Sequence, residues 1–101
     1  MITGPQCRAA RALVEFSRER LAQLSGIDTG TIEQFERKLG TPSDKQIQAL
    51  QDTLEKVGAQ FIWENGGGLG VRLKFNRSEA KRLANLQTAG GVVGSDDVPQ
   101  V

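Results

Sequence analysis

Through the first 57 residues, apolar side chains recur at the three- and four-residue spacing of a helix. This pattern predicts four helices, over residues 4–15, 17–25, 28–37 and 43–57. Each follows or begins with a residue whose side chain can cap a helix: Thr3, Ser17, Asp28 and Ser43. In the first and last helices, Gln6 and Gln46 stand three residues after the cap and complete a capping box.

The apolar stripes identify the side chains expected to face the core. They comprise Cys7, Ala10, Leu13 and Val14, then Leu21, Ala22 and Leu24, then Ile32 and Phe35, and finally Ile47, Leu50, Leu54 and Val57. The stripe of the third helix is thin, and most of that helix is polar. Cys7 is therefore expected to be a small core residue and not a reactive thiol.

After Gly58 the apolar pattern changes to alternation, which is typical of strands. Residues 60–64 and 71–75 are predicted to form a β-hairpin joined by the glycine-rich segment 65–70, which begins with Asn-Gly. One face of this hairpin would carry Phe61, Trp63, Val71, Leu73 and Phe75. Ile62 would lie on the other face with Gln60, Glu64, Arg72 and Lys74. A short helix is expected over 78–87, followed by a flexible tail.

The second and third predicted helices are joined by about three residues that include Gly26. A turn this short between two helices is typical of a helix-turn-helix unit. It forces the helices to cross steeply, so each buries only a narrow stripe. The outer face of the third helix then stays free to enter a major groove, which is about 12 Å wide.

Composition narrows the function classes. The chain has 101 residues, 38% of them apolar, so one small domain with a tail is expected. Thirteen basic residues nearly balance twelve acidic ones, which argues against a generally basic surface. There is no histidine and only one cysteine, so we expect no enzymatic activity, no metal site and no cofactor. A lone cysteine and no apolar run long enough to cross a membrane favour a cytoplasmic protein.

Residues 3–57 resemble the phage-repressor family of helix-turn-helix domains (Cro/C1, or Xre, type). The resemblance rests on Arg8-Ala9-Ala10-Arg11-Ala12-Leu13, Ser17-Arg18-Glu19-Arg20-Leu21-Ala22, Gly26-Ile27-Asp28, Thr31-Ile32-Glu33-Gln34-Phe35-Glu36-Arg37 and Gly40-Thr41-Pro42. The segment that follows resembles a hairpin extension found in a subset of small bacterial regulators. The resemblance implies a mainly α, four- to five-helix λ-repressor-like domain over 1–58, a β-hairpin over 59–75, and a short helix and flexible tail over 76–101.

The resemblance also implies a function and a site. The chain would be a bacterial, nucleoid-associated transcriptional regulator that binds double-stranded DNA as a homodimer. Helix 29–37 would read bases through Thr29, Gly30, Glu33, Gln34 and Arg37. Phosphates would be contacted by Arg18, Thr31, Lys38, Thr41 and Lys45. The hairpin residues Phe61, Ile62, Trp63, Val71, Leu73 and Phe75 would form a possible dimerisation element.

Several alternatives remain open at this point. Glu33 can accept a hydrogen bond from cytosine or pair with Arg37 four residues later, and the pair is favoured. Glu36 is expected to make an intramolecular ion pair or hydrogen bond that fixes the loop after the third helix. The hairpin either packs on helix 43–57 or pairs with a second subunit. The whole protein could instead be a type II antitoxin that also binds a regulatory protein partner, or an interaction adaptor that has lost DNA binding.

Overall fold

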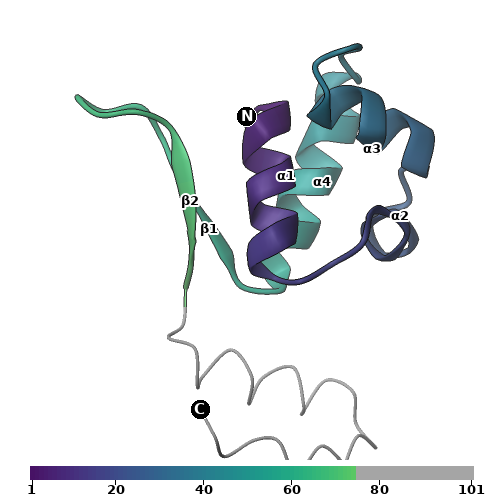
Figure 1. Ribbon diagram of the computed structural model, residues 1–101, viewed down its shortest axis with the longest axis horizontal. Coiled ribbons are helices and arrows are strands. Elements are labelled where there is room, and N and C mark those ends of the chain that lie inside the picture. The colour runs from purple at the N-terminus through teal and green to yellow at the C-terminus, as the bar shows by residue number, and fades with distance from the viewer. Residues whose placement is uncertain (75–101) are drawn as a thin grey trace, which may run out of the picture.

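The computed structural model describes residues 1–74, as four helices followed by a hairpin (Figure 1). The elements are α1 (Gly4–Leu13), α2 (Arg18–Ser25), α3 (Thr29–Glu36), α4 (Asp44–Lys56), β1 (Ala59–Ile62) and β2 (Gly70–Leu73). The predicted mainly α fold with a C-terminal antiparallel hairpin is confirmed. Phe75, the predicted helix 78–87 and the predicted tail lie outside the described residues. None of the helices within residues 1–74 is long and apolar enough to cross a membrane.

All four predicted N-terminal caps are present. The side chains of Thr3, Ser17, Asp28 and Ser43 each accept a hydrogen bond from a backbone N–H in the first turn of the helix that follows. Both predicted capping boxes also form, with the side chains of Gln6 and Gln46 returning to the backbone of the cap residue. These short local bonds satisfy helix N–H groups that would otherwise lack a partner.

One helix ends differently from the prediction. The prediction carried α1 to Glu15, but the helix ends at Leu13, because Glu15 takes a left-handed φ of 61°. The Phe16 N–H then donates to the Arg11 carbonyl at 2.9 Å, which closes a Schellman motif. Lys38 also has a left-handed φ, of 62°, and follows α3, which ends at Glu36, within one residue of the predicted Arg37. Neither position holds the glycine that commonly marks such an end, whereas Gly26 does so after α2.

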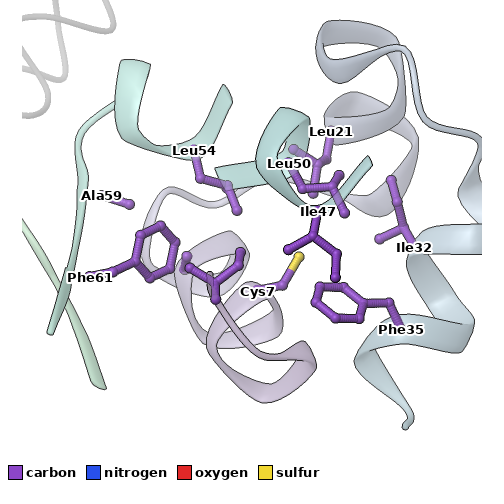
Figure 2. Close-up of a cluster of buried hydrophobic side chains, with 11 residues drawn as sticks. Cys7, Leu21, Ile32, Phe35, Ile47, Leu50, Leu54, Ala59 and Phe61 are labelled. Atoms are coloured by element: carbon purple, nitrogen blue, oxygen red, sulfur yellow. The ribbon is translucent and has the colours of Figure 1, made fainter. Parts of the chain in front are cut away.

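One contiguous core lies between the helices and the inner face of the hairpin (Figure 2). Its fully buried side chains include Cys7, Leu21, Ile32, Leu50 and Leu54. The prediction that Cys7 is a core residue is confirmed. Leu13 and Leu24 were expected to face inward, but they are 41% and 46% exposed. Leu13 shares the exposed side of α1 with Ala9, four residues earlier, and Leu24 lies near the end of α2.

The hairpin packs against its own domain, with β2 beside α1 and β1 beside α4. Phe61 pairs with Val71 and Ala59 with Leu73, and these pairs face the helices as expected. The strands begin and end one or two residues earlier than predicted, so Trp63 lies beyond β1 and is 44% exposed. Its ring remains near that of Phe61, with 6.3 Å between centroids.

A buried glutamine fixes the hairpin to α1. The Gln6 Nε2 amide donates to the Gly70 carbonyl at 2.9 Å and to the Ile62 carbonyl at 3.4 Å. These two residues face one another across the ladder, so a single side chain holds both strands. The same Gln6 side chain accepts the Thr3 N–H in the capping box. One residue therefore caps α1 and positions the sheet.

The substitution Gln6→Ala tests this double role. It removes a capping box and leaves two strand carbonyls without their donor, and each loss costs about 1 kcal/mol. The matched control is Gln46→Ala, which removes the capping box of α4 alone. Urea unfolding is expected to show that Gln6→Ala costs more than Gln46→Ala by about 1 kcal/mol. Equal losses in the two variants would contradict the tether.

Candidate nucleic-acid interface

Helices α2 and α3 follow one another with a short turn between them, as predicted. Residues 26–28 join them, and Gly26, with φ 80°, reverses the chain after α2. In Figure 1, α2 is seen nearly end-on while α3 is seen from the side, so the two helices cross steeply. Asp28 then fixes the start of α3, because its carboxylate accepts the Thr31 hydroxyl at 2.6 Å and the Thr31 N–H at 3.3 Å. These hydrogen bonds lower the pKa of Asp28.

The inner side of α3 is anchored by two apolar residues and one carboxylate. Ile32 and Phe35 lie in the core, and the Glu36 side chain is fully buried. A buried carboxylate is costly unless charged donors surround it. The C-terminal end of α3 can be buried here because hydrogen-bond donors from other helices reach the Glu36 carboxylate.

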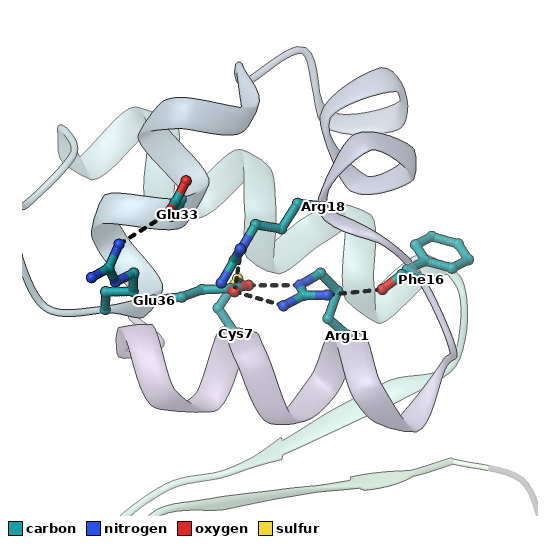
Figure 3. A network of polar contacts seen from close by, with 7 residues as sticks. Cys7, Arg11, Phe16, Arg18, Glu33 and Glu36 are labelled. Carbon is teal, nitrogen blue, oxygen red and sulfur yellow. Dashed lines mark hydrogen bonds and ion pairs between the residues drawn. The ribbon is translucent and has the colours of Figure 1, made fainter.

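Three residues donate to the Glu36 carboxylate (Figure 3). The Arg11 guanidinium binds both oxygens, from Nη2 to Oε1 at 2.8 Å and from Nε to Oε2 at 2.9 Å. The Arg18 Nε reaches Oε1 at 3.1 Å, and the Cys7 thiol donates to Oε2 at 3.4 Å. Arg11 also donates to the Phe16 carbonyl at 3.0 Å, which ties in the chain after α1. This Glu36 cluster links α1, α2 and α3, and it confirms the expected intramolecular ion pair of Glu36.

The cluster shifts two pKa values. Burial alone raises the pKa of Glu36, but the hydrogen bonds from Arg11 and Arg18 outweigh it, so the pKa falls below its ordinary value of 4.5. Burial raises the pKa of the Cys7 thiol, and the neighbouring Glu36 charge raises it further. Glu36 is therefore the ionised member of this contact and Cys7 is a neutral donor. Thiolate chemistry at Cys7 is disfavoured.

The outward side of α3 carries the residues expected to read bases. Gln34 and Arg37 are exposed, and Thr29 is half-exposed. Arg37 Nη1 pairs with Glu33 Oε2 at 3.0 Å, which confirms the favoured intrahelical pair. Gly30 is exposed and has no side chain, and a Cβ there would approach the Asp28 carboxylate to 3.2 Å. Its small size therefore suits the cap of α3.

Two of the residues expected to contact phosphates, Thr31 and Thr41, lie beside Gln34. A small hollow of about 240 Å³ brings Thr31, Gln34 and Thr41 together between α3 and the start of α4. Lys38 and Lys45 are exposed in the loop after α3 and in the first turn of α4. Arg18 differs from these, because its Nε is engaged by Glu36 and its side chain is 29% exposed.

Sequence reasoning missed the roles of Arg11 and Gln6. Arg11 contributes to the family resemblance, but its partner Glu36 is 25 residues away. Gln6 was recognised as part of a capping box, but its strand partners are 56 and 64 residues away. The available signal was a glutamate with two arginines on other helices, Arg11 and Arg18. The number of residues that separates such partners depends on the fold, so spacing in the sequence does not reveal the contact.

No protein-family model matches the chain, and a search against curated proteins also finds no match.

The Glu36 cluster predicts a large difference between two otherwise identical substitutions. Glu36→Gln leaves two guanidinium groups without a buried counter-charge and should cost about 3–5 kcal/mol of unfolding free energy. Glu33→Gln removes an exposed i,i+4 pair and should cost about 0.5 kcal/mol or less. Chemical denaturation of the two variants provides the comparison. Similar losses would show that the cluster does not hold the helices.

The lowered pKa of Glu36 predicts an acid dependence of that difference. Because the folded state favours the ionised carboxylate, its contribution to stability is complete above the ordinary value of 4.5 and is lost as the pH falls through the lower folded-state value. The stability difference between the wild type and Glu36→Gln should therefore be constant near neutrality and shrink below about pH 4.5. Denaturant titrations from pH 7 to pH 3 measure it. A difference that persists unchanged at pH 3 would refute this assignment.

Proposed function

We propose that the protein is a sequence-specific DNA-binding transcriptional regulator that reads the major groove with the outward side of α3, as a homodimer. The observation that carries this proposal is the division of α3 into two sides. Ile32, Phe35 and Glu36 fix the inner side, while Gln34 and Arg37 remain exposed on the outer side. A rigid helix with free polar side chains is what groove reading requires.

The exposed side chains have the chemistry that base edges require. The Gln34 amide offers a donor and an acceptor together, which match the N6 and N7 groups of adenine. The Thr29 methyl group suits the methyl group of thymine, and its hydroxyl suits a phosphate. Arg37 can bind the O6 and N7 acceptors of guanine after it leaves Glu33. Once Arg37 has left it, Glu33 can accept a hydrogen bond from the amino group of cytosine.

Backbone contacts would come from around α3. Thr31 and Thr41 offer hydroxyl groups beside Gln34, and Lys38 and Lys45 offer exposed ammonium groups. The free end of the Arg18 guanidinium would approach a phosphate while its Nε stays on Glu36. The net charge of +1 supplies little non-specific attraction, so one domain alone would bind weakly. Two copies reading half-sites about 34 Å apart would provide the selectivity.

A second candidate function is a protein-interaction adaptor with the same fold. Glu33 favours it, because this carboxylate is exposed on the proposed reading side, where DNA presents negative phosphates. An adaptor would not be retained by DNA even at low salt. A type II antitoxin would bind DNA and would also co-purify with a toxin.

Selection of bound duplexes from a random DNA pool tests the proposal. The wild type should enrich one motif with two related half-sites. Gln34→Ala should lose discrimination at one position in each half-site, because one paired base contact is worth about 1–3 kcal/mol. The matched control is Gln60→Ala, since Gln60 is an exposed glutamine on the hairpin.

The outcomes separate the candidates. Enrichment by the wild type and by Gln60→Ala, with altered preference in Gln34→Ala, is the expected result. Absence of any enriched motif at low salt would overturn the proposal and favour the adaptor. An identical motif for all three proteins would show that the outward side of α3 does not read the bases.

A further inference from the structure

Strand β2 has an edge that no other strand covers within residues 1–74. The Lys74 N–H donates to the Gly58 carbonyl at 2.7 Å, so these two residues form a hydrogen-bonded pair. Bonded and non-bonded pairs alternate along an antiparallel ladder, and the register therefore makes the pairs that contain Val71 and Leu73 non-bonded. The N–H and C=O groups of Val71 and Leu73 thus point away from β1, toward the uncovered edge.

Three of the four glycines near this edge are not required by the backbone conformation. Gly66 has a left-handed φ of 90°, but Gly67, Gly68 and Gly70 are outside that region. A Cβ on Gly67 or Gly68 would meet nothing within 4 Å, and one on Gly70 would meet only the Ile62 side chain, at an ordinary 3.6 Å. A strand glycine of this kind often marks a place where another backbone approaches closely.

We propose that a second copy of this chain pairs its β2 antiparallel with this edge, with Val71 facing Val71 across a two-fold axis. The two hairpins then form one four-stranded sheet in the order β1-β2-β2-β1. This inference rests on the proposed homodimer, but it does not depend on DNA binding.

Charge favours this register over one with the axis at Arg72. With the axis at Val71, each Arg72 faces Gly70 of the second copy, in the closer, non-bonded type of pair. The absent side chain leaves room for the guanidinium. An axis at Arg72 would instead place two guanidinium groups opposite one another, which is unfavourable. Two rows further along the same face, Lys74 faces Gly68 of the second copy. Glu64 of that copy lies in the same row, so the positive Lys74 is near a negative side chain.

Apolar side chains on the inner face match the same register. Across the axis, Val71 meets Val71 beside the buried Phe61 of each copy. In the next row, Trp63 and Leu69 come beside Leu73 of the second copy. Trp63 and Leu69 are 44% and 46% exposed in the single chain, and Leu73 is half-buried. Pairing would cover all three side chains.

Helix α1 extends this surface. A hollow of about 740 Å³ beside the edge is lined by Pro5 and Ala9 of α1 and by Leu69 and Val71 of the hairpin, and Lys38 and Thr41 also line it. Pro5, Ala9 and Leu13 are spaced four residues apart and are all exposed, so they form an apolar row on the helix. A second copy seated at the edge would cover Leu69, Val71 and the adjoining part of this row.

Single-cysteine variants of the full chain test the register. Paired residues on the axis have Cα atoms about 5.5 Å apart, within disulfide reach, whereas Arg72 and its symmetry mate lie beyond the limit of about 7 Å. Cys7 is buried and does not compete. Under mild oxidation without DNA, Val71→Cys should give on the order of tenfold more covalent dimer than Arg72→Cys.

Two further measurements keep the test decisive. If Val71→Cys fails to fold, a mixture of Leu69→Cys and Leu73→Cys proteins should form the mixed disulfide in preference to either homodimer. Sedimentation of the reduced wild type should give the mass of a dimer. A monomer at high protein concentration, equal cross-linking of both variants, or preferential cross-linking of Arg72→Cys would overturn the proposal. Because no DNA is present, its failure leaves DNA binding a separate question.

Discussion

The burial of the Glu36 carboxylate is the constraint on which the arrangement of the helices depends. An ionised group without solvent must be neutralised and fully hydrogen-bonded, and here the donors come from two other helices. Arg11 supplies the bidentate contact from α1, and Arg18 supplies a third bond from the start of α2. The end of α3 is thereby held against both helices at once. Apolar contacts alone would allow more freedom, since Ile32 and Phe35 are the only buried apolar side chains on α3.

Helix α3 carries two glutamates whose roles differ because their surroundings differ. Glu33 and Glu36 differ by three positions, but one pairs with Arg37 on the surface and the other is enclosed by Arg11, Arg18 and Cys7. The surface pair is weak and exchanges readily with other partners, which suits a side chain that has to release an arginine to a ligand. The buried pair is fixed and suits a structural role. Anchoring one side of α3 and leaving the other free is the physical basis of the proposed function.

Local signals in the sequence predicted most of the fold. The caps at Thr3, Ser17, Asp28 and Ser43 and the alternation after Gly58 depend on neighbours within a few residues, so they could be predicted without the structure. The end of α1 could not, because Glu15 adopts a left-handed conformation that glycine usually takes. The outward positions of α3 followed from helical spacing. The Gln6 tether and the Glu36 cluster join residues 18 to 64 positions apart, and no local pattern encodes such contacts.

We propose that the outward side of α3 lies against DNA, and this can be tested by recording amide chemical shifts while duplex DNA is added at low salt. The largest shift changes should fall on residues 29–37 and on the loop before α4, with small changes in the core of α1. The Gln34 side-chain amide, which reports a base contact, should also shift. Changes that are confined to the hairpin and the exposed row of α1, or the absence of any change at low salt, would contradict it.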